Sequence, residues 1–284
     1  MNAFVRRLCL IALVVRFGIA APFVVGAEET PSRPQRVLLI GQGPDGHPRA
    51  THEYNAAAHL MAKLLSRTER LQTIAVSADG EWKEGPELLD GVDAVVVFVS
   101  QGAHWIQEDA ARLAAFQKLA RRGGGLICLH WGMGTQDAKN IKAFVDLFGG
   151  CHGGPDRRYK VVDVRTKLVA DSHPILRGIE PLDVHEEFYF KLKTPKSTDG
   201  FVPLIKVAIE DEDHTVSWAW ERPDGGRSFG FTGLHFHDNW KHDAYRRLMT
   251  QAVHWVLKRD PAQDGDLVPL SSVDLELPPA DTNR

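Results

Sequence analysis

The sequence predicts an α/β fold in which a mostly parallel sheet carries helices on both faces. Apolar runs at residues 36–41, 92–99 and 126–129 show no alternation, which is typical of strands buried on both faces. Segments with apolar residues at three-to-four spacing lie between these runs and indicate helices. Such an order builds a doubly wound sheet, whose ligands bind outside the carboxyl ends of the strands.

The first half of the domain alternates predicted strands with predicted helices. A helix over 53–66 follows the first strand, because Ala57, Leu60 and Leu64 recur at helical spacing. Three glycines at 123–125 are expected to end a later helix. In chain order, the remaining elements are strands at 71–76, 92–99 and 126–129 and helices at 106–121 and from Asp137 to Phe148.

The second half is richer in β-branched and aromatic residues. We expect its strands to extend the sheet, partly in the antiparallel sense, before a closing helix at 243–258. These strands are predicted at 160–165, 202–209, 215–220 and 228–233.

The first residues have the pattern of a secretory signal. Arg6 and Arg7 precede an apolar run that ends in small residues, which predicts a signal peptide at 1–27 and a periplasmic or secreted protein. Arg16 divides that run into pieces too short for a membrane helix, so no stable span is expected after cleavage. The other predicted parts are a linker at 28–34, one domain at 35–259 and a flexible, proline-rich tail at 260–284.

Charge and cysteine content narrow the function classes. The chain has 34 Lys and Arg against 37 Asp and Glu, and this acidic balance argues against nucleic acid as a partner. Beyond the predicted signal, only Cys128 and Cys151 remain, so the fold does not depend on disulfides and both thiols are expected to be buried. A small-molecule partner is expected, and a homo-oligomeric assembly stays open.

Two loops after predicted strands carry polar and aromatic residues. In the glycine-rich loop after the first strand, His52 and Tyr54 are expected to face the ligand crevice, although His52 could instead only pack at the helix start. After the third strand, His104 could form part of a cavity wall. Trp105 could stack on a sugar ring or serve as a core residue.

Two further segments carry candidate catalytic residues. His130 and Trp131 lie where a strand runs into a tight turn, and a neutral imidazole there can act as a base or a metal ligand. Later in the chain, Glu187 offers a carboxylate for proton transfer or ligation. Its neighbour Glu186 is interpreted as a solvated surface carboxylate.

The last polar segment, at 233–240, contains a pair of histidines. A strand would place His235 and His237 on one face, where they could share a metal or only form a polar rim. The candidate substrate-binding residues are Tyr54, His104, Trp105, Trp131, Tyr189, His237, Asn239 and Trp240.

In their order along residues 36–257, these motifs resemble the ThuA-like, or trehalose-utilisation, family. The resemblance implies a three-layer flavodoxin-like fold shared with class I glutamine amidotransferases, and a link to disaccharide or keto-sugar breakdown. His130 stands where amidotransferases place their catalytic cysteine, and Cys128 lies two residues earlier inside the strand. The positions carried over are His52, His130, Glu187 and His235, whereas His237 and Asn239 resemble features of a subgroup.

From these residues and the resemblance, we predict a hydrolase or lyase that acts on a disaccharide or keto-glycoside. His130, Glu187 and His52 are the predicted catalytic residues, because a base can remove a proton next to a sugar carbonyl. A divalent metal such as zinc is predicted on His52, His130 and His235. Two alternatives remain: a non-catalytic carbohydrate-binding or accessory protein, and an amidohydrolase or peptidase that uses a thiol.

Overall fold

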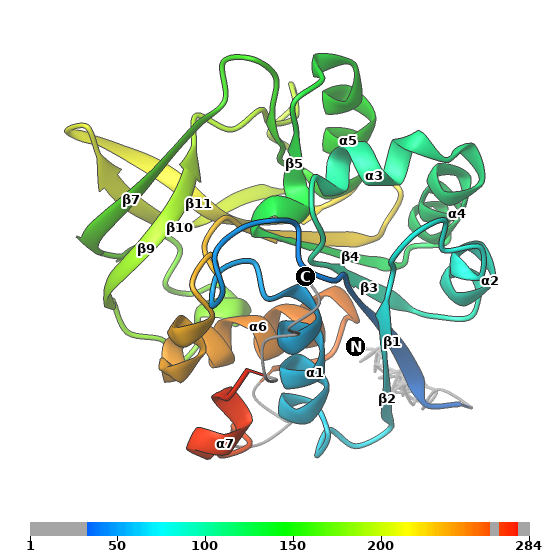
Figure 1. Cartoon of the computed structure of the whole chain (residues 1–284), viewed down its shortest axis with the longest axis horizontal. Helices are drawn as coiled ribbons and strands as arrows, with labels where there is room; N and C mark the ends of the chain where they lie inside the picture. Colours follow the sequence, from blue (N-terminus) through cyan, green and yellow to red (C-terminus); the bar gives the residue numbers. More distant parts are fainter. Residues whose placement is uncertain (1–32, 262–266, 278–284) are drawn as a thin grey trace, which may run out of the picture. The chain divides into compact units, whose positions relative to one another are not determined.

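An eight-stranded sheet forms the centre of the protein in a computed structural model that describes residues 33–261 and 267–277 (Figure 1). Its strand order is β2-β1-β3-β4-β12-β11-β10-β8. The predicted signal peptide and most of the predicted linker lie outside the described residues.

On one side of this sheet, the neighbouring strands β2, β1, β3, β4 and β12 are all parallel. The order β2-β1-β3-β4 within it is the flavodoxin-like order, so the predicted fold class is confirmed. The remaining strands, β11, β10 and β8, pair in the antiparallel sense. The bounds are β1 Gln35–Gly41, β2 Leu71–Ser77, β3 Ala94–Val97, β4 Gly125–Leu129, β12 Arg227–Phe231, β11 Glu212–Glu221, β10 Phe201–Ile209 and β8 Lys167–Leu168.

Helices cover both faces of the sheet and give two separate hydrophobic cores. In β1, Val37 and Leu39 pack in the core with α1 and α6, whereas Leu38 and Ile40 pack in the core on the opposite face. This double burial explains why the strand sequence does not alternate. The helices are α1 Tyr54–Leu64, α2 Gly85–Asp90, α3 Gly102–Glu108, α4 Ala110–Arg121, α5 Ile141–Phe148 and α6 Asp243–Val256, with short 3-10 helices η1 His130–Met133, η2 Ala138–Asn140, η3 Pro174–Leu176 and η4 His237–Lys241.

The single helix predicted at 106–121 is wrong, because the chain forms α3 and α4 there. Asp109 separates them with an extended backbone, and its side chain accepts a hydrogen bond of 2.7 Å from the backbone N–H of Arg112. An aspartate in this position caps the second helix and satisfies a backbone donor that would otherwise be unpaired.

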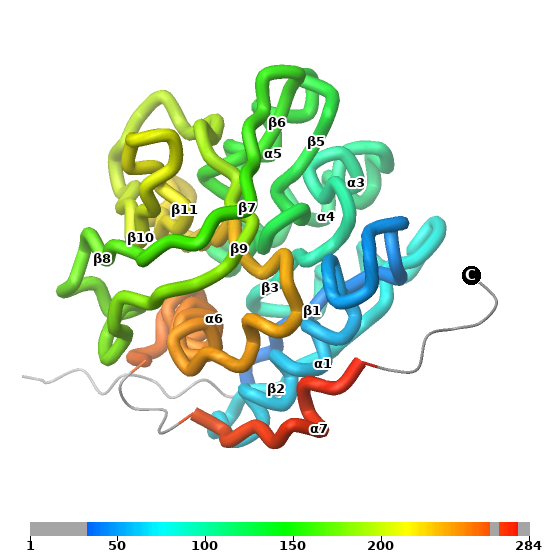
Figure 2. Tube along the Cα trace, turned by 60° about the vertical axis from the view of Figure 1, so that its left-hand side comes forward, coloured from blue at the N-terminus to red at the C-terminus, as the bar shows by residue number. Residues whose placement is uncertain are grey.

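The strand predicted at 160–165 does not extend the main sheet, so that expectation is wrong. Instead, β7 Arg158–Arg165 pairs with β9 Asp183–Phe190 in a separate antiparallel ribbon (Figures 1 and 2). Much of β7 is exposed, which is consistent with a position outside the central sheet. A second small pair joins β5 Gly134–Thr135 to β6 His152–Gly153.

Part of the predicted tail packs on the domain. Within residues 267–277, α7 Ser272–Leu275 begins with a capping box formed by Ser271 and Asp274. Asp274 also forms an ion pair with Lys63 of α1, and Leu270 and Leu275 pack against the core. This segment is therefore bound to the domain by both polar and apolar contacts.

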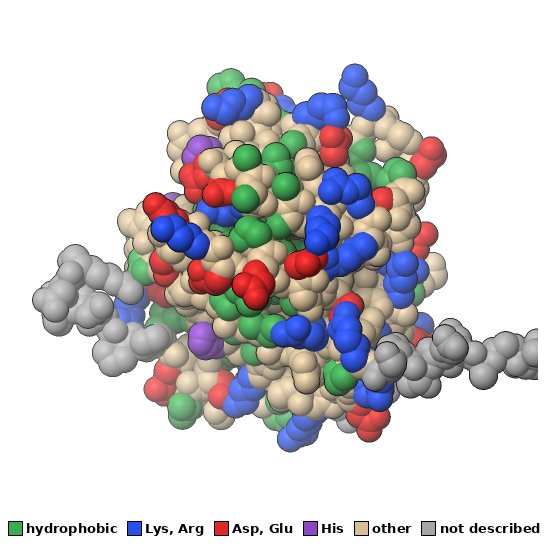
Figure 3. Space-filling model, turned by 90° about the vertical axis from the view of Figure 1, so that its right-hand side faces the viewer, with side chains coloured by type: hydrophobic (Ala, Val, Ile, Leu, Met, Phe, Trp, Pro, Cys, Tyr) green, Lys and Arg blue, Asp and Glu red, His purple; other side chains and the backbone are tan. Residues whose placement is uncertain are grey.

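The surface mixes charges of both signs. On the face that lies to the right in Figure 1, Lys and Arg side chains alternate with Asp and Glu, and apolar areas are small (Figure 3). Within residues 33–261 and 267–277, no helix is long and apolar enough to cross a membrane.

Candidate functional site

A cavity of about 530 Å³ opens at the carboxyl ends of the parallel strands. Its walls come from the loops after β1 and β3, the turn after β4, strand β9 and the segment after β12. The loops after β1 and β3 leave neighbouring strands in opposite directions, which is where open α/β sheets bind ligands. The order of strands and helices along the sequence predicted a site at this edge of the sheet.

His130 occupies a strained turn directly after β4. Its φ of 43° is unusual for a residue other than glycine, and such strain is concentrated at functional sites. The turn also needs Gly132, because a Cβ there would lie 2.4 Å from the carbonyl oxygen of Val97. His130 is fully buried, and its Nδ1–H donates to the carbonyl oxygen of Thr232 at 2.7 Å. Its Nε2 therefore presents a lone pair toward His52 and His235.

His52 is oriented by a carboxylate from its own loop. Its Nδ1 lies 3.0 Å from Oδ2 of Asp45, and Tyr54 donates its hydroxyl to the same oxygen at 2.6 Å. Burial alone would raise the pKa of Asp45, but hydrogen bonds from His52, Tyr54 and His47 hold this pKa well below its ordinary value. Asp45 is thus ionised, Nδ1 of His52 carries the hydrogen, and Nε2 of His52 is left with a lone pair.

His235 is bound to the His52 loop through the backbone. The N–H of His52 donates to the carbonyl oxygen of His235 at 3.1 Å, and the N–H of His237 donates to that of Ala50 at 2.8 Å. A bridge between Thr51 and Phe236 lies between these two bonds. Two segments far apart in sequence are therefore joined like short strands, which brings the two imidazoles together.

Glu186 holds the segment that carries His235 from the other side. Its carboxylate accepts hydrogen bonds from the backbone N–H groups of Leu234 at 2.8 Å and His235 at 3.1 Å, and from Nδ2 of Asn239 at 3.0 Å. The side chain is fully buried, and burial raises its pKa to about 7 against the effect of these bonds. Its interpretation as a solvated carboxylate is wrong, because β9 turns it inward.

Glu187 and Tyr189 reach the cavity from β9. Successive residues of a strand point to opposite faces, so these two face the cavity while Glu186 faces the loop. Oε1 of Glu187 lies 3.7 Å from Nε2 of His130 and 3.6 Å from Nδ1 of His235. Burial raises the pKa of Glu187 to about 7 and that of Tyr189 well above its ordinary value.

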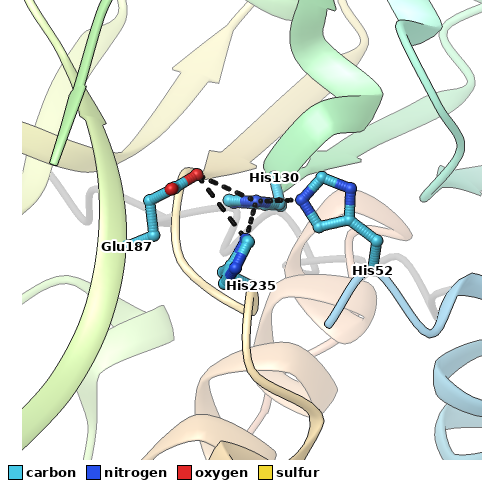
Figure 4. Close-up of side chains that lie close together, drawn as sticks. All are labelled: His52, His130, Glu187 and His235. Carbon is cyan, nitrogen blue, oxygen red and sulfur yellow. Dashed lines mark hydrogen bonds and ion pairs between the residues drawn. The ribbon is translucent and has the colours of Figure 1, made fainter. Parts of the chain in front are cut away.

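The ligand atoms of His52, His130, Glu187 and His235 all lie within 4.8 Å of one another, and their side chains point toward one another (Figure 4). Nε2 of His52 lies 3.0 Å from Nε2 of His130, and Nδ1 of His235 lies 3.2 Å from that same atom. With hydrogens on the opposite ring nitrogens, both Nε2 atoms are acceptors, and the hydroxyl of Tyr189, 3.0 Å from Nε2 of His130, is a donor beside them. Imidazole lone pairs directed to one point, with a carboxylate beside them, form a donor set that fits a divalent metal.

The family model described as trehalose utilisation, ThuA, matches residues 37–256. The chain belongs to the ThuA family. Membership relates it to carbohydrate utilisation and agrees with the order of motifs along the sequence. No protein among the curated proteins matches this chain.

Solved structures of ThuA-like proteins share the fold at low sequence identity. One from Bacteroides uniformis is 15% identical, with a TM-score of 0.63 over 83% of this chain and 98% of that chain. Another, from Parabacteroides merdae, is 11% identical, with a TM-score of 0.58 over 79% of this chain and 90% of that chain. A cytoplasmic protein from Salmonella typhimurium is 13% identical, with a TM-score of 0.53 over 78% of this chain and 98% of that chain.

Of the three candidate tryptophans in this ThuA-family chain, only Trp131 lines the cavity. Trp105 is buried between α3 and α4, where its ring lies 5.2 Å from that of Trp82 and packs against the Arg112 guanidinium. Trp240 is 1% exposed and belongs to the core with α1 and α6. Trp105 and Trp240, which were predicted to bind substrate, therefore do not line the cavity, because helix packing buries both rings elsewhere.

The other candidate residues divide between support and surface. His237 begins η4, so the strand that was to align it with His235 is absent, and its buried ring does not line the cavity. Asn239 binds Glu186, and Tyr54 binds Asp45, so both support the site from behind. His104 is half-exposed, pairs with Glu108 and lies outside the cavity lining.

Several residues of the site were not singled out from the sequence. Asp45 and His47 lie in the same loop as His52, and this spacing was the available signal for them. His152 stacks on Tyr189 with ring centroids 3.9 Å apart, and no local pattern connects it with β9. Arg157 also lines the cavity, from the short segment between β6 and β7.

Proposed function

We propose that this ThuA-family chain is a metal-dependent enzyme that cleaves an oxidised glycoside, such as a keto-disaccharide, by elimination or hydrolysis. One observation carries the proposal: Nε2 of His52 and Nε2 of His130 lie 3.0 Å apart although Asp45 and Thr232 occupy the opposite nitrogens. Three imidazoles with an open side are typical of a catalytic metal site.

The three histidines would hold the cation, and the ribbon would meet the ligand. When bound, a divalent cation such as zinc supplies a Lewis acid that polarises a carbonyl oxygen. Outer contacts from Asp45 to His52 and from Thr232 to His130 keep the two rings in a ligating orientation. Glu186 does the same for His235 through the backbone.

Glu187 is the proposed general base. A carbonyl on the sugar acidifies the neighbouring C–H bond, and Glu187 takes that proton as the bond breaks. The electron pair forms a carbon–carbon double bond while the glycosidic C–O bond breaks, and the leaving oxygen takes a proton from water. A pKa raised to about 7 suits a base that works near neutral pH. Tyr189 stays protonated and can donate a hydrogen bond in the same place.

A non-catalytic carbohydrate-binding protein is the second candidate. The rings of Trp131 and Tyr189 line the cavity with centroids 5.8 Å apart and an angle of 69° between their planes, and would suffice to stack on a sugar. The thiol-dependent alternative has no such support. Cys128 is fully buried in β4, and burial raises its pKa well above the ordinary value.

The signal-like segment at 1–27 supports a proposal about where the enzyme works. We propose that the chain is exported and acts in the periplasm or outside the cell. Sequencing of the N-terminus of protein recovered from an expressing cell would show a start near residue 28 if the segment is cleaved.

Metal content and turnover test the function together. Protein purified without chelators should contain about one equivalent of a divalent metal and should release free sugar from a keto-disaccharide. Removal of the metal with a chelator should stop this release, and addition of the same metal should restore it.

Two outcomes would contradict the proposal in different ways. Less than about 0.1 equivalent of any transition metal would end the metal assignment, because sites with several protein ligands are normally well occupied. Full metal occupancy and sugar binding without turnover of any keto-glycoside would favour the carbohydrate-binding alternative.

A further inference from the structure

The wall of the cavity also contains an arginine. Arg157 lies in the turn between β6 and β7 and lines the same cavity as Glu187 and His235. Among the lining residues within the described ranges, Arg157 is the one Lys or Arg. A guanidinium is positively charged, so a single one in a wall made of histidines, aromatic rings and carboxylates favours anions as ligands.

The guanidinium of Arg157 keeps most of its hydrogen-bonding capacity. One of its nitrogens, Nη1, donates to the carbonyl oxygen of Gly154 in its own turn at 3.2 Å. The neighbouring carboxylate, Asp156, pairs instead with Lys193 at 2.5 Å. In the described part of the chain, no ion pair includes Arg157. Its remaining N–H groups are a planar set of donors that matches a carboxylate.

The acids of the cavity do not neutralise this arginine. Asp45 is bound by His47, His52 and Tyr54, and Glu187 lies next to His130. Burial, and after it the positive charge of Arg157, lowers the pKa of His152 to about 3. His152 is therefore neutral and adds no competing positive charge beside Arg157.

Two tyrosines of the β7–β9 ribbon line the cavity. Tyr159 pairs directly with Tyr189 across the β7–β9 ribbon, and residues directly opposite each other in an antiparallel pair share a face. Tyr189 lies beside His130, whereas Tyr159 is 60% exposed at the opening of the cavity. A sugar ring could stack on Tyr159 at this opening, where Arg157 of the same chain segment also lines the cavity.

We infer that the cavity contains an anion subsite in which Arg157 binds the carboxylate or phosphate of an acidic sugar stacked on Tyr159. The inference rests on the proposed function, since it assigns the class of carbohydrate that this same cavity takes. Arg157 and a carboxylate can form two parallel hydrogen bonds, which favours a uronic or aldonic acid over a neutral sugar.

Calorimetric binding of three sugars to the metal-loaded protein tests the subsite. Glucuronate should bind at least about tenfold more tightly than glucose, as expected for hydrogen bonds between charged groups. Glucose 6-phosphate distinguishes a phosphate subsite from a carboxylate subsite, according to which of the two acids binds more tightly.

Variants of Arg157 separate its role from that of the metal. In R157Q the preference for glucuronate over glucose should disappear while glucose affinity stays within about twofold, and R157K should retain part of the preference because the charge remains. R158Q is the matched control, because Arg158 is exposed on β7 and does not line the cavity.

Two results would overturn the subsite: binding of both glucuronate and glucose 6-phosphate no tighter than that of glucose in the wild type, or an unchanged preference for the acidic sugar in R157Q. Metal content measured on the same samples keeps this result apart from the proposed function. If the protein contains no metal but its glucuronate binding still depends on Arg157, the anion subsite is retained and the proposed metal-dependent enzyme is contradicted.

Discussion

The parallel half of the sheet and the β7–β9 ribbon contribute to one cavity in different ways. From the parallel half come His52, His130 and His235, each placed by a loop or turn at the end of a strand and oriented by a hydrogen bond or a backbone bridge behind it. From the ribbon come Glu187 and Tyr189, placed only by the alternation of β9. The difference teaches that the proposed cation site is built into the fold, whereas the groups proposed to contact the ligand lie on an added, more exposed element.

Glu187→Gln should produce the largest effect on turnover. Loss of the proposed base should lower the turnover of a keto-glycoside by about 10²–10⁴-fold, while metal content stays near that of the wild type. E180Q, which changes an exposed glutamate ahead of β9, is the control and should leave both quantities unchanged. Loss of the metal together with activity in E187Q would break the comparison, because Glu187 would then be a ligand like the histidines.

His130→Ala should produce the next largest effect, on metal affinity. Removal of a ligating imidazole should weaken binding by more than about 100-fold, beyond the ~10–100-fold typical of residues behind the ligands. A competition titration against a chelating dye would measure this change. H104A is the matched histidine control, since His104 is half-exposed and outside the cavity. Equal losses in H130A and H104A would show that the histidines act only through stability.

The smallest expected effect is an absence of reaction at the two cysteines. Burial raises the pKa of Cys151 to about 12 and that of Cys128 well above its ordinary value, so at neutral pH both remain protonated thiols. Iodoacetamide should therefore leave both unmodified in the folded protein and alkylate both in denaturant, as read by peptide mass spectrometry. Rapid labelling of Cys128 under native conditions would restore the thiol-dependent alternative.

The parallel half was the more predictable of the two regions. Its strands are buried on both faces, and such strands are continuous apolar runs in the sequence, as at 36–41 and 126–129. The turn at His130 was also predictable from the sequence, because the apolar strand ends there in His-Trp-Gly. For the ribbon, the strand at 160–165 was recognised but its partner sheet was not, since propensity does not specify pairing.

The sequence by itself determined the fold class, the alternation of strands and helices in the first half, and the four histidine-containing motifs near strand ends. Only the tertiary structure decided that His52, His130, Glu187 and His235 converge, that Trp105 is a core residue while Trp131 faces the cavity, and that Glu186 is buried. The reason is physical. Periodicity and turn chemistry act over a few neighbouring residues, whereas the contacts that orient these side chains join segments dozens of residues apart and form only when the sheet and ribbon are packed.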